Sequence, residues 1–301
     1  MTDEMRHAFE AAGCEGSFCV RSLDGGGEVA LAPDSPAAAA STAKVLIALE
    51  AETRFADGRL DPRERVTLRA DDRTDGPTGV SLLADDVELS LRDLVPLMLT
   101  ISDNPSTDEL LRWIGTDTVN ATAQRLGLTG TAVDADLRTL LDDVGRDLGR
   151  AGWADLQSWA ATATPEQVAE SDRLVPTVRA LDPVHSPLRT TARDMTRLLE
   201  LIWTDRAGPA EACARVRSVM ARQLTRHRLG SGFRPPVRVA AKSGSLFGVV
   251  RNEVGVITLP DGHRYAAAVL TRSAPGADDA AISAAIGRVA ALAVAALAGP
   301  A

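Results

Sequence analysis

The residues with the clearest chemical potential are Ser41 and Lys44, which begin and end a Ser-Thr-Ala-Lys tetrad at the start of an apolar stretch. If that stretch is a helix, the hydroxyl and the amine lie one turn apart on the same face. Serine is a weak nucleophile unless a neighbouring base takes its proton, and N–H groups at a helix N-terminus stabilise the oxyanion that forms on the attacked carbonyl. The tetrad therefore indicates acyl transfer, although this spacing also arises by coincidence in many helices.

Two further tripeptides contain the same kinds of residue. Residues 102–104 have the sequence Ser-Asp-Asn and begin an expected helix, so their alternative interpretation is an ordinary N-cap. Residues 242–244 have the sequence Lys-Ser-Gly and end an expected strand, where the glycine lets a ligand or another backbone approach closely. Taken alone, the second tripeptide is equally a plain strand end.

Lysine is rare in this chain, which adds weight to these motifs. Of the 33 Lys and Arg residues, only Lys44 and Lys242 are lysine, which leaves 31 arginines. Arginine stays charged at any working pH, whereas a lysine amine gives up its proton when burial or a nearby charge lowers its pKa. Both lysines fall inside the motifs. We therefore interpret them as chemical groups rather than as surface charges that survived by chance.

In the order SxxK, SDN and KSG, the three motifs make the sequence resemble the class A-like branch of the serine β-lactamase and penicillin-binding-protein superfamily. The resemblance extends over nearly the whole chain. Ser41 and Ser102 stand 61 positions apart, which is similar to the family's separation. Residues 187–195 also resemble the family's segment that leads into a helix after its Ω-loop.

The resemblance implies a catalytic role for five residues. Ser41 attacks a carbonyl and becomes acylated, and Lys44 helps to activate it. Ser102 relays the proton toward the departing nitrogen, and Lys242 keeps positive potential beside Ser102. The N–H groups of Ser41 and Ser245 form the oxyanion hole, which is worth about 3 kcal/mol per donor in other acyl-transfer enzymes.

The resemblance also implies which residues bind the substrate. Asn104 binds the amide of the acyl side chain, and Ser243 hydrogen-bonds the substrate carboxylate, with Gly244 allowing close approach to the strand. Arg251, nine residues after Lys242, is expected as a second carboxylate anchor, and its alternative is a surface arginine on a sheet.

The region after the second motif departs from the family pattern. Class A β-lactamases carry a glutamate, in an ExxxN pattern, that positions the deacylating water, but alignment places Leu137 and Leu141 at those two positions. Residues 134–185 are expected to form an enlarged Ω-loop with one or two helices of its own. Its carboxylates are candidate replacement bases, although each is otherwise a surface charge: Asp136, Asp142, Asp143, Glu166 and Glu170.

Local patterns predict the elements that must position the motifs. Helical periodicity and capping signals predict helices over residues 2–12, 91–100, 105–114, 118–126, 191–203 and 278–297, and a buried helix from the SxxK tetrad onward. Strand composition and turn signals predict strands over residues 17–23, 28–31, 237–243, 249–258 and 265–271.

Strands at both ends of the chain, with helices between them, cannot form consecutive βαβ units. We therefore predict an α+β fold of three layers (α/β/α), with a five-stranded antiparallel sheet assembled from both termini, flanking helices and an inserted all-helical domain. The predicted domains are residues 1–54 with 235–301 for the sheet and 55–234 for the helices. This arrangement is the β-lactamase/transpeptidase-like one that the resemblance implies.

Composition limits the range of functions. The 301 residues are 45% hydrophobic with a net charge of −8, which is typical of a globular chain without the positive field that nucleic-acid binding needs. Cys14, Cys19 and Cys213 lack CxxC spacing and are expected to be reduced and buried. The four histidines lack metal-ligand spacing and no glycine-rich nucleotide loop is present, so no metal and no cofactor is expected.

The ends of the chain bear on its location. The first residues lack the basic and apolar regions of a secretory signal, and the apolar stretch 289–298 is about half the length that a bilayer requires. These features predict a cytoplasmic monomer that does not enter a membrane, and an exported mature form would look the same.

The function predicted from these residues is a serine hydrolase of the β-lactamase type, which forms an acyl-enzyme on Ser41 and hydrolyses a β-lactam or a related amide. Two alternatives stay open. One is an intracellular esterase, amidase, acyltransferase or DD-peptidase-like enzyme with slow deacylation. The other is a non-catalytic penicillin-binding sensor module. In each case the expected partner is a small molecule.

Overall fold

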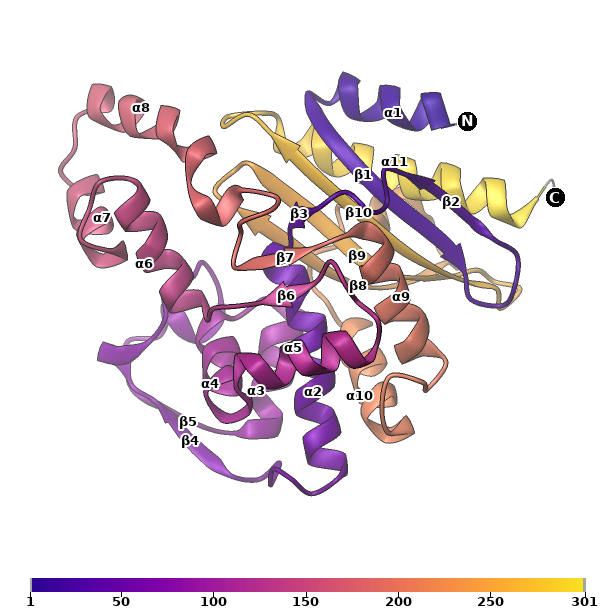
Figure 1. Cartoon of the computed structure of the whole chain (residues 1–301), viewed down its shortest axis with the longest axis horizontal. Helices are drawn as coiled ribbons and strands as arrows, with labels where there is room; N and C mark the ends of the chain where they lie inside the picture. The colour runs from indigo at the N-terminus through magenta and orange to yellow at the C-terminus, as the bar shows by residue number, and fades with distance from the viewer. Residues whose placement is uncertain (1, 300–301) are drawn as a thin grey trace.

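The computed structural model describes residues 2–299, and its centre is a five-stranded antiparallel sheet with strand order β2-β1-β10-β9-β8 (Figure 1). The strands are β1 (Cys14–Ser22), β2 (Glu28–Leu31), β8 (Arg238–Leu246), β9 (Val250–Thr258) and β10 (Arg264–Ser273). β1 pairs with β10 along its whole length, so the two ends of the chain meet in the middle of the sheet. The predicted fold class is confirmed.

Glycine-containing turns fix two of the hairpins of this sheet. Gly25, Gly26 and Gly27 connect β1 to β2, and all three have positive φ angles, which glycine adopts without steric cost. Gly262, with a φ of 94°, plays the same part between β9 and β10. Both turns were predicted from sequence because this backbone conformation demands particular residues.

Helices cover both faces of the sheet. On one face lie α1 (Thr2–Ala11) and α11 (Asp279–Ala298), which share a core with Phe18 and Ile257 of the strands. On the other face α9 (Ala192–Trp203) packs on β1 and β10. By length and composition α11 could cross a membrane, but half of its most apolar window is buried inside this structure. It is the sheet-packing helix that the sequence predicted, and Figure 1 shows it beside α1.

Residues 55–234, together with α2 (Lys44–Ala56), supply the helices that surround the motifs. They are α3 (Leu91–Thr100), α4 (Asn104–Ile114), α5 (Thr116–Arg125), α6 (Leu137–Asp147), α7 (Trp153–Ala160), α8 (Pro165–Leu174), α9 and α10 (Ala210–Met220). Short 3-10 helices connect them: η2 (Ala70–Asp72), η3 (Gly79–Leu82), η4 (Val175–Thr177), η5 (Arg179–Leu181) and η6 (Leu229–Gly232). The domain boundaries at 54/55 and 234/235 stay predictions.

The prediction that residues 55–234 are purely helical is wrong. β4 (Arg65–Leu68) pairs with β5 (Val87–Ser90), and β7 (Leu188–Thr190) joins β3 (Ala37–Ala38) to β6 (Ala132–Val133). These strands are two to four residues long. Alternation of apolar and polar residues needs a longer stretch to be recognised, which is why the sequence did not reveal them.

Residues 134–185 form the enlarged segment that the sequence predicted, with three α-helices, α6, α7 and α8, instead of one or two. Figure 1 shows α7 and α8 at the upper left edge of the molecule, apart from α2 and α5 in the lower centre of the view. α6 and α7 pack on each other, and α6 also contacts η5.

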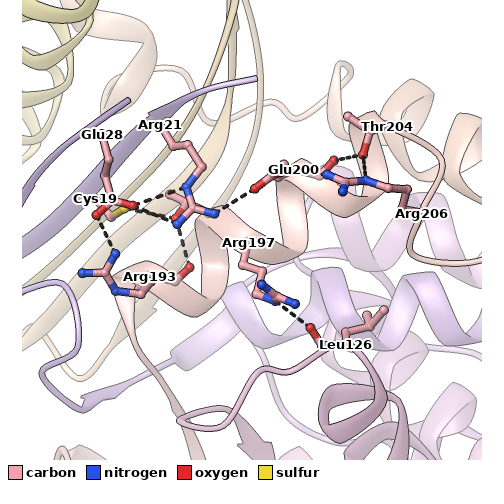
Figure 2. Close-up of polar contacts among 10 residues, drawn as sticks. Cys19, Arg21, Glu28, Leu126, Arg193, Arg197, Glu200, Thr204 and Arg206 are labelled. Carbon is pink, nitrogen blue, oxygen red and sulfur yellow. Dashed lines mark hydrogen bonds and ion pairs between the residues drawn. The ribbon is translucent and has the colours of Figure 1, made fainter. Parts of the chain in front are cut away.

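A chain of partly buried ion pairs fastens α9 to the first hairpin (Figure 2). Arg21 of β1 donates to Glu28 of β2 and to Glu200 of α9, each at 2.8 Å. Glu28 also accepts from Arg193 at 2.6 Å, and Glu200 from Arg206 at 2.7 Å. Because each carboxylate is shared by two guanidinium groups, the hairpin and the helix are held in one relative position.

The three cysteines are free and buried, as predicted. Burial raises the pKa of the Cys14 thiol to about 11 and that of Cys19 to about 12. A thiol reacts as its thiolate, so these groups are unreactive near neutral pH and serve as small apolar side chains.

Candidate active site

Ser41 and Lys44 lie at the N-terminal end of the buried helix α2. Ser41 belongs to the preceding 3-10 helix η1 (Ala40–Ala43), and the Lys44 N–H donates to the carbonyls of Ser41 and Thr42, which continues the turn into α2. Ala40 has a φ of 48°, a left-handed conformation that redirects the chain between β3 and η1. Ser41 is partly exposed, whereas Lys44 is 1% exposed. The tetrad therefore places a buried amine one turn away from an accessible hydroxyl.

The Lys44 amine joins the first motif to the second. Its Nζ donates to the Ser102 carbonyl at 2.7 Å and to Asn104 Oδ1 at 2.9 Å, and it lies 3.4 Å from Ser102 Oγ. Ser102 has a φ of 65°, which is uncommon outside glycine and persists only where the surrounding structure holds it. The amine is thus within hydrogen-bond reach of the hydroxyl that was predicted to relay a proton.

Asp103 confirms that the second motif caps a helix, which was its alternative interpretation. Its carboxylate accepts from the Ser106 N–H at 2.9 Å, which caps α4, and from the Val80 N–H at 2.8 Å. The middle residue of the tripeptide therefore caps the helix, while the residues on either side of it contact Lys44.

β8 carries the third motif along the edge of the sheet, directly against η1. A Cβ atom at Gly244 would lie 3.1 Å from the Ala39 carbonyl oxygen and 3.1 Å from the backbone nitrogens of Ser41 and Thr42. A side chain here would push the strand and the backbone of the candidate nucleophile apart by a few tenths of an ångström, so glycine favours this close approach.

Lys242 places the second amine of the chain in the interior beside the first. It is 1% exposed, and its Nζ donates to the Ser243 carbonyl at 2.8 Å. Burial lowers the pKa of Lys242 well below the ordinary lysine value, and the nearby charge of Lys44 lowers it further, against an opposing effect of Glu253.

Burial also makes Lys44 a plausible base. It lowers the pKa of Lys44 to about 7, although the negative charges of Asp108 and Asp103 act in the opposite direction. An amine that titrates near neutral pH exchanges protons readily in both directions. Neither lysine is in bulk water, and all three motifs meet around Ser41.

A cavity of about 60 Å³ lies beside Ser41 and brings residues from each motif region together. Ser41 comes from the first motif, Asn104 from the second, and Ser245 follows the third directly. Most of the remaining wall is apolar and consists of Leu137, Leu140, Leu141, Leu188 and Leu246. The cavity is therefore a place where an acyl group fits and where water has few polar partners.

The two leucines at the positions expected for the deacylating glutamate and its asparagine, Leu137 and Leu141, both line this cavity. None of the five candidate replacement carboxylates lines it within residues 2–299. Asp136 caps α6, Asp142 accepts from the Trp153 N–H, Asp143 pairs with Arg146 and Arg179, and Glu166 and Glu170 are exposed on α8. The prediction that one of them replaces the missing base is not supported by their positions.

Arg251 does not reach the site, and its predicted role as a carboxylate anchor is wrong. Its guanidinium pairs with Asp279 at the start of α11 and donates to the Gly248 carbonyl at 2.8 Å and to Ser273 Oγ at 3.0 Å. Because Arg251 is 5% exposed, these groups occupy it inside the protein and leave it unavailable to a ligand.

Arg228, which no sequence pattern singled out, supplies the charge beside the third motif instead. Its Nη2 donates to Ser245 Oγ at 2.6 Å, and its Nη1 donates to the carbonyls of Gly244 and Asn252 at 2.9 Å each. The loop before β8 carries it, far in sequence from the residues it contacts. Among 31 arginines, no local signal distinguishes this one.

Asn252 is a second residue that sequence reasoning missed. It is buried on β9, and its Nδ2 donates to the carbonyls of Ala38 at 2.9 Å and Ala39 at 3.3 Å, while its Oδ1 accepts from the Thr271 N–H at 3.0 Å. It thereby ties the segment just before Ser41 to the sheet. The scarcity of asparagine, with three in the chain, was the one available signal.

Comparisons with known proteins agree with this geometry. Residues 1–297 match the Beta-lactamase2 family, described as the beta-lactamase enzyme family. Over 289 residues the chain is 32% identical to the beta-lactamase regulatory protein BlaB of Streptomyces cacaoi, a match that covers 91% of this chain and 90% of that protein.

Solved structures extend the comparison. A beta-lactamase from Sphaerobacter thermophilus DSM 20745 is 26% identical, with a TM-score of 0.76 over 98% of this chain and 96% of that one. A leucine-to-glutamate variant of PBP-A, in an acyl-enzyme complex with penicillin G, is 21% identical, with a TM-score of 0.72 over 97% of this chain and 95% of that one. The second likeness shows a shared fold.

Proposed function

We propose, from the premise that this chain belongs to the beta-lactamase enzyme family, that Ser41 is acylated by a β-lactam and that the acyl-enzyme is hydrolysed slowly. The observation that carries the proposal is the environment of Lys44. A buried amine with a pKa of about 7 contacts Ser102 and Asn104 and lies one turn from an accessible serine. Such an amine accepts a proton at neutral pH, which is what a serine nucleophile requires.

In the proposed acylation step, Ser41 Oγ forms a bond to the lactam carbonyl carbon, and the ring C–N bond breaks. The Oγ proton passes to the neutral Lys44 amine and then, through the Ser102 hydroxyl, to the ring nitrogen that leaves. The backbone N–H groups of Ser41 and Ser245 stabilise the oxyanion that forms on the carbonyl. No proton or electron pair is left over, because the ring nitrogen takes up the proton that the serine loses.

The positive side of the site suits a substrate with a carboxylate, as β-lactam antibiotics have. Ser243 and Ser245 offer hydroxyls on β8, and Arg228 lies against Ser245. Lys242 lies on the same strand and donates to the Ser243 carbonyl, and burial lowers its pKa well below the ordinary lysine value, so Arg228 is the main source of positive charge at this position. Charge-assisted hydrogen bonds of this kind position a carboxylate more strongly than neutral ones.

Slow deacylation follows from the apolar wall of the cavity. Hydrolysis of the ester needs a water molecule and a base beside the acyl carbonyl, and Leu137 and Leu141 provide neither. We expect the adduct on Ser41 to persist long enough to be isolated. In this respect the protein behaves as a penicillin-binding protein more than as an efficient β-lactamase.

The similarity to a regulatory protein favours a second candidate function. BlaB of Streptomyces cacaoi is described as a beta-lactamase regulatory protein and is 32% identical to this chain. In a regulatory role the long-lived acyl-enzyme is the signal, and the same chemistry at Ser41 serves it. An intracellular amide or ester is the alternative substrate if β-lactams do not react.

One experiment separates these functions. The protein is mixed with a chromogenic cephalosporin, and turnover is followed by absorbance while the mass of the intact protein is measured. A single persistent adduct that maps to Ser41, with little turnover, supports the proposal. Rapid turnover without an adduct contradicts slow deacylation. The absence of both turnover and adduct contradicts β-lactam chemistry and leaves the other amides and esters.

The pH dependence of adduct formation tests the base assignment. Below pH 7 the Lys44 amine is protonated and cannot accept the serine proton, so the acylation rate is expected to rise about tenfold per pH unit there and to level off above about pH 7. The measurement is the single-turnover rate of adduct formation from about pH 5 to about pH 9. A rate that is flat across this range would exclude Lys44 as the titrating base.

Gly244→Ala tests the close approach of β8 to the nucleophile. The added methyl group pushes the strand and the Ser41 backbone apart, and we expect the acylation rate to fall about tenfold or more because the oxyanion hole is misplaced. The midpoint temperature of thermal unfolding, measured in parallel, is expected to fall by about a few degrees. An acylation rate equal to that of the unchanged protein would mean that the strand is not part of the site.

A further inference from the structure

Trp153, at the start of α7, contacts two segments that each lead to a residue lining the Ser41 cavity. Its ring packs against Phe247 of the β8–β9 turn, with ring centroids 5.9 Å apart and an angle of 45° between the planes. Its indole Nε1 donates to Asp75 Oδ2 at 2.8 Å. Asp75 belongs to the helical part of the molecule, and Phe247 belongs to the sheet.

Each of these partners is attached to a residue that lines the cavity. Phe247 directly follows Leu246, which forms part of the apolar wall. The backbone carbonyl of Asp75 accepts from Asn104 Nδ2 at 2.8 Å, and Asn104 also lines the cavity. Trp153 therefore holds the sheet wall and the helical wall together without lining the cavity itself.

The position of Trp153 is fixed by close packing within the enlarged segment. The Trp153 N–H donates to Asp142 Oδ1 at 3.0 Å. A Cβ atom at Gly145 would lie 2.3 Å from the Gly152 carbonyl, so α6 meets the start of α7 without room for a side chain. Gln157, one turn along α7, donates to Asp75 Oδ2 at 2.7 Å and adds a second link to the helical wall.

The space between the two walls is partly open to solvent and small compared with a substituted β-lactam. Its volume is about 60 Å³, whereas a protein cavity that takes a benzene ring measures about 150 Å³. An aryl acyl group held between the walls beside Ser41 therefore requires them to separate, and separation breaks the contacts of Trp153.

We propose that Trp153 acts as a positioning residue for specificity: by clamping Phe247 to Asp75, it restricts acylation of Ser41 to compounds with small acyl substituents. This inference rests on the proposed acylation of Ser41. In this proposal the enlarged segment 134–185 selects the substrate, whereas the three motifs supply the groups that react with it or bind it.

The test compares two penicillins of different bulk. The second-order rates of Ser41 adduct formation are measured by intact mass for 6-aminopenicillanic acid, which has no acyl substituent, and for benzylpenicillin. In Trp153→Ala we expect the ratio of the benzylpenicillin rate to the 6-aminopenicillanic acid rate to rise about tenfold or more. Trp153→Phe keeps a ring against Phe247 but loses the bond to Asp75, and its ratio is expected to fall between the two.

Trp159→Ala is the matched control. Trp159 lies on the same helix, and its ring packs under the Arg150 guanidinium, 4.2 Å from the ring centroid. Trp159→Ala removes a side chain of the same size but leaves the contacts with Phe247 and Asp75 in place. The ratio of the benzylpenicillin rate to the 6-aminopenicillanic acid rate is therefore expected to equal that of the unchanged protein. A ratio in Trp153→Ala that equals or falls below that of the unchanged protein overturns the inference.

A second pair of probes tests the role of Trp153 even if the proposed acylation by β-lactams is wrong. If neither penicillin forms an adduct in any variant, β-lactam acylation is refuted. The same ratio is then measured with a small and an aryl-substituted fluorophosphonate, which react with an activated serine without a lactam. If the ratio of the aryl-substituted to the small fluorophosphonate rate rises in Trp153→Ala, the clamp is supported. If that ratio is unchanged, the clamp is refuted independently of β-lactam chemistry.

Discussion

Lys44→Arg is expected to slow the acylation of Ser41 by about 10³-fold or more, because it removes the general base and retains the positive charge. Burial lowers the pKa of the Lys44 amine to about 7, which makes the neutral form available at neutral pH. A guanidinium does not deprotonate in this range. The measurement is the rate of adduct formation with a penicillin, followed by intact mass.

Two further variants serve as controls for Lys44→Arg. Ser41→Ala gives the background, because no hydroxyl remains to be acylated and no adduct is expected. Arg228→Lys makes the reverse exchange, arginine to lysine, beside Ser245. At that position the positive charge matters and proton transfer does not, so the acylation rate is expected to change by no more than about tenfold. If Lys44→Arg acylates as fast as the unchanged protein, another group activates Ser41.

Leu137→Glu is expected to shorten the lifetime of the acyl-enzyme by about 10²-fold or more. Leu137 opens α6 and lines the cavity beside Ser41, so a carboxylate there has the reach to activate water against the ester. The new negative charge also raises the pKa of Lys44, because it favours the ammonium form. The rise of the acylation rate is therefore expected to move to higher pH. Decay of the isolated adduct, followed by intact mass, gives the lifetime.

Leu137→Gln is the matched control for this change. Glutamine is polar and has nearly the same size as glutamate, but it carries no charge and is not a base at neutral pH. A long adduct lifetime in Leu137→Gln with a short one in Leu137→Glu assigns the effect to the carboxylate. Equal lifetimes in the two variants would show that polarity alone admits water, and that a missing base is not what limits deacylation.

The strands of the sheet, its glycine turns and the helix that begins at the tetrad were predictable because local rules determine them. The meeting of the three motifs was implied instead by the family resemblance that their order carries. Gly25–Gly27 specify the first turn, capping and periodicity specify α9, and the tetrad at a helix start places Ser41 and Lys44 one turn apart. The scarcity of lysine pointed to both amines before their burial was known.

The rest of the site depends on contacts between distant segments, for which a single sequence carries no signal. Arg251 has the expected position on β9, but Asp279 of α11 holds its guanidinium outside the site. Arg228 reaches Ser245 from a loop that has no pattern of its own. Trp153 lies in the enlarged segment, and nothing in its neighbourhood foretells a contact with Phe247.

The order of the sheet has a consequence for biosynthesis. Within this sheet β1 is made before the other strands, and it lies between β2 and β10, the strand that is made after the other four. Ser41 and Lys44 emerge well before β8 exists to bring Lys242 and Gly244 against them. Because pairings between such distant segments form late, a nascent chain carries its nucleophile in a chemically silent form until β8 has been made and paired.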